Sequence, residues 1–391
     1  MTFFPNLRFP GFENEWEVKK LGDVCEINPK NSTLPNSFVY IDLESVIDGV
    51  LIKENKITSY EAPSRAQRIL RSEDILFQMV RPYQKNNFFF NLSGNYVAST
   101  GYAQIRTIQN PRFIFQYLHN QKFVDKVIER CTGTSYPAIN STDLSEINLS
   151  VPLMDEQEKI SSFLFSIDKR IQTQRKIIEK LETLMKESRE KIFLRKIKFK
   201  DDNFSKWEEK KLGDILIESN EKSIKNNQYR VISSTAKGLF YQDDYFTRDI
   251  ASQDNTGYKI LKKEQLVFSP QNLWLGNINV NIDFEIGLVS PSYKIFNFNT
   301  SLTSYSYCNF FLKTSLMLFE YAQSSIQGAS VVRRNLDLNM FFNIRILLPS
   351  IKEQAKITSF LSSIQKKIDI EKQILEKLEL QKKFLLANLF V

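Results

Sequence analysis

A polar stretch in the first half of the chain carries side chains of the kind that hydrogen bond with DNA bases. Arginine suits guanine and asparagine or glutamine suits adenine, whereas contacts to phosphate position a protein on the duplex. Arginine and glutamine recur on both sides of the apolar run 75–80, so both flanks could face one groove. The alternative is a solvated loop beside a strand. The candidates are Ser64, Arg65, Gln67, Arg68, Arg71, Arg81, Tyr83, Gln84 and Lys85.

A second polar group in the other half of the chain could do the same. Trp274 lies between amide side chains and could pack on a sugar or a base, although a core position is the more usual role of tryptophan. Arg333 and Arg334 are candidates for phosphate contact, but the first half offers only Thr-Ser-Tyr at 134–136 in the matching place. The other candidates are Lys259, Lys262, Lys263, Gln271, Asn272 and Asn277.

Motifs for catalysis are missing from the sequence. No Gly-x-x-x-x-Gly-Lys-Ser/Thr loop is present, and neither Asn-Pro pair continues into the Asn-Pro-Pro-Tyr/Phe of an adenine methyltransferase. The only histidine, His119, falls in a predicted helix, and we interpret it as a surface or packing residue. The acidic residues show no spacing typical of a catalytic metal cluster. These features argue against a stand-alone enzyme such as a nuclease.

The cysteine pattern favours a reducing compartment. Cys25, Cys131 and Cys308 are odd in number, lie far apart and form no Cys-x-x-Cys pair. No apolar run is long enough to span a membrane, and the first twelve residues do not resemble a signal peptide. We therefore expect a cytoplasmic protein without a zinc site or a disulfide framework.

The basic charge of the chain is concentrated in two segments. The net charge is +8, which favours an acidic partner such as nucleic acid. Residues 155–200 hold 13 basic and 8 acidic side chains, and residues 352–391 hold 8 and 5, so these two segments account for the whole excess. Any DNA-reading surface elsewhere must therefore arise from local clustering.

The chain of 391 residues contains an internal duplication. The pattern Trp-Glu-x-Lys-Lys-Leu-Gly-Asp occurs at 16–23 and at 207–214, and Pro-x-x-x-Glu-Gln occurs at 152–157 and at 349–354. Two long copies indicate two similar domains and not a solenoid. Each copy continues from its tryptophan into short strand-like runs, such as 38–41 and 75–80, and then into a helix-like stretch. The fold class expected is α+β.

The helix-like stretch of the first copy begins at Asn110-Pro111, a cap followed by proline at the first helical position. Its predicted buried stripe is Ile114, Tyr117, Leu118 and Val124, and the counterpart in the second copy is roughly 303–321.

Each copy ends in a long predicted helix with a heptad pattern of apolar residues. Ser350 and Glu353 form a capping box before the second helix. At about 1.5 Å per residue each helix would be about 60 Å long. The predicted pairing residues are Ile160, Leu164, Ile167, Ile171, Gln174, Ile178 and Leu181 in the first helix, and Ile357, Leu361, Ile364, Ile368, Glu371, Leu375 and Leu378 in the second.

So narrow an apolar seam is not stable alone in water and must pack on another helix. Each helix could pack on its own domain or form a homodimer. We favour a pair in which the two helices pack antiparallel on each other, with one globular domain at each end. Gln174 and Glu371 interrupt the seam at equivalent positions, where they would lie near each other and could fix the register.

At this point the sequence resembles the specificity subunits of type I restriction-modification systems. The resemblance is carried by Leu-Arg-Phe-Pro-Gly-Phe at 7–12, by the run 64–68 followed by 74–77 and 80–83, and by the repeated Pro-x-x-x-Glu-Gln before each heptad helix. It covers essentially the whole chain. It implies target-recognition domains at 1–152 and 201–348, related by a pseudo-twofold, and conserved-region helices at 153–200 and 349–391.

The resemblance also implies a function. Each domain would read one half of a split, asymmetric site in double-stranded DNA. Two modification subunits would dock on the helices and methylate adenine with S-adenosylmethionine, and restriction subunits that use ATP and magnesium can join. The chain itself would bind no cofactor and catalyse nothing. The alternative is a non-catalytic coiled-coil scaffold that binds proteins and shows no sequence preference on DNA.

Overall fold

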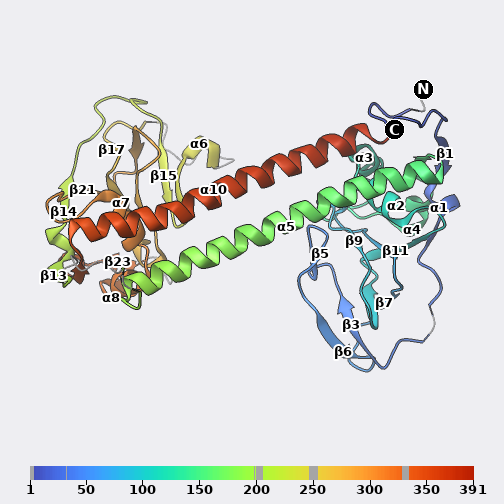
Figure 1. Ribbon diagram of the computed structural model, residues 1–391, viewed down its shortest axis with the longest axis horizontal. Helices are drawn as coiled ribbons and strands as arrows, with labels where there is room; N and C mark the ends of the chain where they lie inside the picture. Colours follow the sequence, from blue (N-terminus) through green and yellow to red (C-terminus); the bar gives the residue numbers. More distant parts are fainter. Residues whose placement is uncertain (1–3, 32, 198, 200–205, 246–253, 328–333) are drawn as a thin grey trace. The chain divides into compact units, whose positions relative to one another are not determined.

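The computed structural model describes residues 4–31, 33–197, 199, 206–245, 254–327 and 334–391. It divides into two compact units. Figure 1 shows the chain coloured along its sequence. The first unit comprises residues 1–176 and 372–391, and the second comprises residues 177–371. Each unit holds one mixed domain and parts of both long helices, α5 (Met154–Phe193) and α10 (Ile351–Asn388).

The domain of the first unit contains two four-stranded sheets. One has the order β2-β11-β8-β9, and the other has the order β6-β3-β10-β7 with β3 and β10 parallel. The strands are β1 (Glu17–Lys20), β2 (Cys25–Ile27), β3 (Ser37–Ile41), β4 (Val46–Ile47), β5 (Val50–Leu51), β6 (Asn55–Thr58), β7 (Ala66–Ile69), β8 (Ile75–Gln78), β9 (Phe88–Phe89), β10 (Tyr96–Ser99), β11 (Tyr102–Thr107) and β12 (Asn148–Val151). The helices before α5 are α1 (Leu21–Val24), the 3-10 turn η1 (Pro82–Gln84), α2 (Pro111–Tyr117), α3 (Gln121–Glu129) and α4 (Ser141–Ser145).

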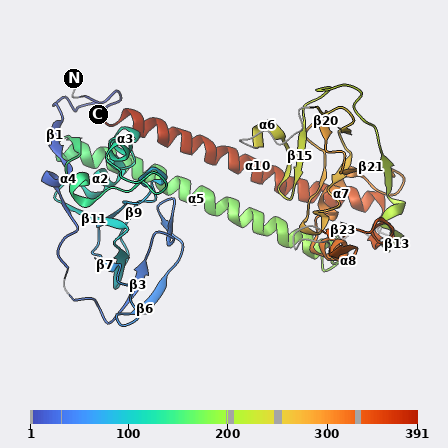
Figure 2. The same cartoon turned by 180° about the vertical axis from the view of Figure 1, so that it is seen from behind.

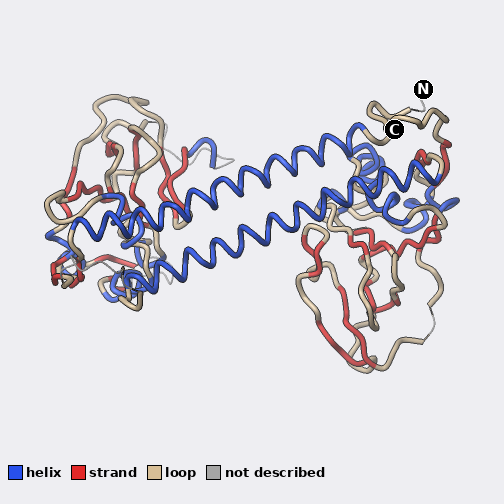
Figure 3. The backbone as a smooth tube through the Cα atoms, viewed as in Figure 1, coloured by secondary structure: helices blue, strands red, loops and turns tan. Residues whose placement is uncertain are grey.

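The second unit repeats part of this plan. Its four-stranded sheet, β14-β21-β18-β19, has the same order of elements as β2-β11-β8-β9. The strands are β13 (Glu208–Lys211), β14 (Leu216–Ser219), β15 (Ile232–Thr235), β16 (Gly238–Tyr241), β17 (Lys259–Lys262), β18 (Leu266–Phe268), β19 (Ile278–Val280), β20 (Ile286–Val289), β21 (Lys294–Phe298), β22 (Ser325–Gln327), β23 (Arg334–Leu336) and β24 (Arg345–Leu348). The helices are η2 (Leu212–Asp214), α6 (Gln242–Tyr245), η3 (Leu273–Leu275), α7 (Tyr305–Phe311), α8 (Ser315–Gln323) and α9 (Leu338–Phe342). The mixture of helix and sheet that Figure 3 shows confirms the α+β class.

The two long helices run antiparallel where they meet in the first unit. Asp168 of α5 pairs with Lys382 of α10 at 2.5 Å, and Arg175 pairs with Glu379 at 2.7 Å, so numbers rise along one helix as they fall along the other. The seam residues of α5 from 160 to 171 share one core with Leu378, Leu385 and Leu389. Figures 1 and 2 both show the end of α10 beside the beginning of α5.

The second unit packs its own halves of these helices in the same manner. Met185 and Ile192 of α5 share a core with Ile357, Leu361, Ile364 and Ile368 of α10. Gln174, the polar residue of the α5 seam, is buried in the first unit, and Glu371 is partly exposed in the second. In each unit, the seam therefore continues the apolar core of the domain.

A phenylalanine at the end of each long helix completes the core of a domain. Phe390, after α10, packs on Trp16, Phe113 and Tyr117 of the first unit. Phe193, at the end of α5, packs on Tyr307 and Phe311 of the second. Each unit is thus built from one domain, the helix that follows it and the end of the other helix.

Some element boundaries differ from those predicted. The first long helix ends at Phe193 and not at residue 200, since the left-handed conformation of Arg195 (φ 59°) stops it. The units do not end at residues 152, 200 or 348, because both share the long helices. The strand predicted at 75–80 ends at Gln78.

The single helix-like stretch of each copy is in fact two helices. The side chains of Asn120 and Thr314 cap the second helix by accepting hydrogen bonds from backbone N–H groups, which interrupts the first. The predicted cap at Asn110 is confirmed, because its side chain accepts a hydrogen bond from Phe113 N at 3.0 Å. All four residues of the predicted stripe, Ile114, Tyr117, Leu118 and Val124, are buried.

Candidate nucleic-acid interface

The repeated Lys-Leu-Gly-Asp motif builds a joint within each domain, between its first short helix or 3-10 turn and a later helix, α4 or α9. Asp23 accepts a hydrogen bond from Lys20 N, and Asp214 accepts the same bond from Lys211 N. A Cβ on Gly22 would lie 3.1 Å from Ser145 Cβ, so a larger residue would push α1 away from α4. A Cβ on Gly213 would lie at the same distance from Phe342 Cβ in the second unit. The motif is therefore repeated for structural reasons.

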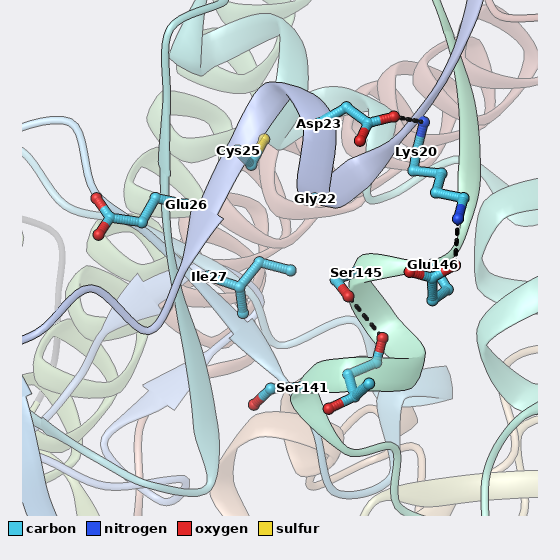
Figure 4. Close-up of a pocket in the computed structure, with 10 residues that line it drawn as sticks. Lys20, Gly22, Asp23, Cys25, Glu26, Ile27, Ser141, Ser145 and Glu146 are labelled. Carbon is cyan, nitrogen blue, oxygen red and sulfur yellow. Dashed lines mark hydrogen bonds and ion pairs between the residues drawn. The ribbon is translucent and has the colours of Figure 1, made fainter.

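A hollow beside this joint is lined by an ion pair and a buried thiol. Figure 4 shows it between α1, β2 and α4, with Lys20 reaching across to Glu146 at 2.6 Å. Its sulfur belongs to Cys25, and burial raises the pKa of this thiol to about 11, so the thiol is not ionised at neutral pH. Among the described residues, no group of histidine, cysteine, aspartate and glutamate is arranged to hold a metal ion.

The repeated Pro-x-x-x-Glu-Gln motif fixes the first turn of each long helix to its domain. Gln157 Nε2 donates to Gln109 and to the carbonyl of Pro152, and its Oε1 accepts from Asn110 N. Gln354 makes the equivalent bonds to the carbonyls of Leu302 and Pro349. Each glutamine is buried, so its hydrogen bonds are needed to offset its desolvation.

The glutamates of this motif are held differently in the two units. Arg8 donates two hydrogen bonds of 2.8 and 2.7 Å to the Glu156 carboxylate. Glu353 instead accepts one hydrogen bond of 3.1 Å from Trp207 Nε1. Ser350 caps α10 by accepting a hydrogen bond from Glu353 N at 3.3 Å. The predicted capping box is thus half formed, because the Glu353 carboxylate faces Trp207.

The structure divides the first predicted DNA cluster into two groups. Ser64, Arg65, Gln67 and Arg71 are exposed, and Arg68 is partly buried, on β7 and its flanking turns. Strand β7 belongs to the sheet β6-β3-β10-β7, whereas the strand before Arg81 belongs to the other sheet. The two flanks of residues 75–80 therefore lie on different sheets. Whether either group contacts DNA remains a prediction.

The second group lies on a rigid turn after β8. Buried Gln78 donates to Val80 O at 2.8 Å and to Gln84 Oε1 at 2.9 Å, which fixes the turn from within. Arg81 adopts the left-handed conformation (φ 55°), and its guanidinium lies 4.2 Å over the Tyr136 ring. Tyr83 is exposed on η1.

Lys85 is held away from this surface. Its ammonium donates to His119 O at 3.1 Å and to Gln121 Oε1 at 2.8 Å, and desolvation lowers its pKa. His119 packs on Phe115 with its Nδ1 2.7 Å from the Phe115 carbonyl. Desolvation lowers the pKa of His119 to about 4, consistent with a packing residue.

Several candidates of the second unit have structural partners. Lys259 is buried and donates to Tyr293 O at 2.6 Å, and Asn277 is buried and bonded twice to Ser234. Lys262 pairs with Glu221 at 2.5 Å, and Lys263 pairs with Glu285. These contacts leave Asn272, Trp274 and Arg334 as the better placed members of the predicted set. Arg333 lies outside the described residues.

Trp274 lies on the turn after β18, which matches the turn after β8. The guanidinium of Arg334 lies 4.2 Å over the Trp274 ring, and Arg334 N donates to Gln271 O at 3.3 Å. Gly276 ends the turn with a φ of 85°.

Sequence reasoning missed Tyr136, which is 64% exposed under Arg81. The one sequence feature that could have identified Tyr136 is its position in the repeat, which corresponds to that of Arg333 and Arg334 in the second copy.

The sequence matches one protein family twice. The family is described as type I restriction modification DNA specificity domain, and the matches cover residues 13–183 and 204–380. The chain is 23% identical over 412 residues to the type I restriction enzyme MjaVIII specificity subunit of Methanocaldococcus jannaschii, which covers 96% of this chain and 92% of that protein. The MjaIX specificity subunit of the same organism is 22% identical over 300 residues, covering 68% and 69%.

Other relatives agree. The HindI specificity subunit of Haemophilus influenzae is 24% identical over 180 residues, 44% of this chain and 39% of that protein. A solved chain of a type I R-M system, studied for complex assembly and conformational transition, has a TM-score of 0.57 at 20% identity, covering 97% and 98%. The S subunit of a type I system from M. genitalium has a TM-score of 0.56 at 17% identity, covering 99% of each chain. This chain belongs to the type I restriction-modification DNA specificity family.

Proposed function

We propose that this chain is the sequence-specific DNA-binding subunit of a type I restriction-modification complex, with one half of a bipartite, asymmetric DNA site read by each domain. One observation supports this most directly. The two units share a sheet order and an attachment to the long helices, yet they carry different side chains on the turns after β8 and β18. Different surfaces on one framework suit two different half-sites.

In this proposal the chain directs chemistry that other subunits perform. Two modification subunits would methylate adenine with S-adenosylmethionine, and restriction subunits would translocate and cut DNA with ATP and magnesium. The chain would bind double-stranded DNA and none of these cofactors, in the cytoplasm. Among the described helices, none is both long enough and apolar enough to cross a bilayer.

The modification subunits would dock on the outer faces of the long helices. Large apolar side chains remain exposed there, on residues that do not belong to the heptad seam. Exposed apolar side chains on helices that also carry the basic excess of the chain suit a protein partner that also holds nucleic acid. Among them are Ile374, Leu380 and Phe384 in the first unit, and Ile177, Leu184, Phe360 and Ile370 in the second.

The competing proposal is a scaffold that binds only proteins, which the same exposed apolar residues would also suit. The two differ in their behaviour toward DNA. A DNA-reading subunit would bind its site with an affinity that falls steeply with salt, because bound phosphates release counterions. A scaffold would show no sequence preference.

A methylation map tests the proposal. The chain is expressed with its neighbouring methyltransferase subunit, and modified adenines in the host DNA are sequenced. We expect a split, asymmetric motif. Exchange of residues 28–108 and 132–138 for those of a relative should change one half only, since it leaves both repeated motifs and the bond between Gln157 and Gln109 intact. An assembled complex that methylates no defined motif would favour the scaffold.

A further inference from the structure

The matching turns of the two units carry the same kind of side-chain pair with the partners exchanged. In the first unit, the turn after β8 supplies arginine (Arg81), and the segment between α3 and α4 supplies the ring (Tyr136). In the second unit, the turn after β18 supplies the ring (Trp274), and the segment between α8 and α9 supplies arginine (Arg334). Both guanidinium groups lie 4.2 Å from the ring centroid.

We propose that these two stacked arginines, Arg81 and Arg334, each read a guanine in the major groove, one in each half of the DNA site. This inference rests on the proposed function and adds to it a specific base and a specific residue for each half-site. The aromatic partners, Tyr136 and Trp274, are positioning residues.

The charge surroundings of the two arginines are alike. Several lysines of the second unit are neutralised by carboxylates, as in the pairs of Lys262 with Glu221 and Lys294 with Glu218. Within the residues that the structure describes, neither Arg81 nor Arg334 has a carboxylate within ion-pair distance. Their charge thus remains available to an outside acceptor.

The hydrogen-bonding state of the two side chains is also matched. The Nε atom of each is buried without a partner among the described residues, whereas the terminal nitrogens are neither buried nor bonded there. A guanidinium held flat on a ring keeps its edge free, and that edge fits the O6 and N7 acceptors of guanine with two bonds. The ring also limits the rotamers of the arginine, so less entropy is lost on binding.

The backbone under each pair is fixed. Arg81 N donates to Pro137 O at 2.8 Å and Arg334 N donates to Gln271 O at 3.3 Å, so in each unit a hydrogen bond joins the two segments that carry the pair. Arg81 holds a left-handed conformation, which is unfavourable for a non-glycine residue. Buried Gln78 holds the first turn, and buried Asn277 holds the second.

The test begins with the methylation map of the wild-type complex and of complexes with R81A and R334A. We expect R81A to relax one guanine position in one half-site and R334A to relax one guanine position in the other, each by about tenfold to a hundredfold. Y136F and W274F should retain the preference, whereas Y136A and W274A should weaken it. Thermal unfolding checks that each variant is folded.

Two other stacked arginines provide matched controls. Arg112 lies 4.3 Å over Phe165, and Arg230 lies 3.6 Å over Tyr241 beside Asp243. We expect R112A and R230A to leave the motif unchanged, because neither lies on the matched turns.

A chemical probe separates base reading from phosphate contact. Binding is measured for duplexes that carry the mapped site with single guanines replaced by 7-deazaguanine, which lacks the N7 acceptor. Wild type should lose affinity at one guanine in each half-site, and R81A should be insensitive to the change in its own half. A uniform loss of affinity across all sequences, or an unchanged motif, would overturn the inference while the proposed function stands. A wild-type complex without any motif would overturn both.

Discussion

The two units of this specificity-family chain share a framework and differ at its exposed turns. Both have the same order of four strands, the same Leu-Gly-Asp joint and the same buried glutamine at the start of the long helix. On the turns after β8 and β18, however, arginine and ring exchange segments. The motif residues that attach each domain to its long helix are the same in both copies of the repeat. The residues on the exposed turns differ between the two copies.

The contacts that attach the start of each long helix to its domain differ in strength, although the Pro-x-x-x-Glu-Gln motif is repeated. Arg8 makes a two-bond ion pair with Glu156 in the first unit, whereas Glu353 in the second accepts one bond from Trp207. A charged, bidentate contact is the stronger of the two. The contact in the first unit should therefore tolerate less change.

The largest effect is expected from charges in the shared seam. Ile167 and Ile364 are equivalent and buried in the cores of the first and second unit. Ile167→Glu or Ile364→Glu should destabilise its unit by about 4 kcal/mol or more, because a buried carboxylate has no partner there. Urea unfolding and assembly with the methyltransferase subunit measure this.

The exposed neighbours Ser166 and Ser363 are the controls for these variants. Ser166→Glu and Ser363→Glu should leave unfolding and assembly within experimental error. Equal losses in the control and seam variants would show that the seam does not determine the stability of the pair.

The comparison of these contacts predicts the next largest effect. Arg8→Ala should cost about 3 kcal/mol, because it leaves the buried Glu156 carboxylate unpaired, whereas Trp207→Phe should cost about 1 kcal/mol. Arg8→Lys, which keeps the charge without the two-bond geometry, should fall between these values. Denaturant unfolding of wild type and the three variants measures these losses in the free energy of unfolding. A larger loss for Trp207→Phe than for Arg8→Ala would contradict the comparison of the two units.

A partly buried base precedes the cap of the second domain helix in each unit. Desolvation lowers the pKa of His119 to about 4 and that of Lys313 to about 8. In both cases the folded state binds fewer protons than the unfolded state, so stability falls as pH falls through the interval between the two pKa values. The charges that face His119 are Lys382, Asp168 and Lys85, and those that face Lys313 are Arg189 and Asp283.

The two units should therefore differ in their pH windows. Through His119 the first unit should lose about 2 kcal/mol between pH 7 and pH 5, and His119→Gln should remove this loss. Through Lys313 the second unit should gain stability as pH rises from 8 to 10, and Lys313→Met should abolish that gain. Thermal unfolding across pH 4.5–10 measures the pH dependence of stability in both units. If both variants kept the pH dependence of wild type, neither base would be its cause.

The smallest effect is expected from the paired lysines of the second unit. Lys262→Ala and Lys263→Ala should each change stability by about 0.5 kcal/mol or less, because exposed ion pairs contribute little. They should also change DNA affinity less than Arg334→Ala does. A larger loss of affinity in the lysine variants would place the DNA contact on β17 instead of on the stacked pair.

The sequence by itself determined the framework. The repeated letters predicted two similar domains, and the heptad spacing predicted two long helices, because both patterns are local and periodic. The cap at Asn110 and its buried stripe followed from residue types alone. The family resemblance came from the order of the same motifs.

Only the tertiary structure decided which polar residues remain available to a ligand. Lys259, Asn277 and Lys85 look like DNA contacts in the sequence, but the fold brings each of them to a buried or bonded partner far along the chain. Tyr136 was not among the predicted DNA contacts, but the fold places it under Arg81, a residue 55 positions earlier. Hydrogen-bond and stacking partners depend on long-range packing, which periodicity and composition do not encode.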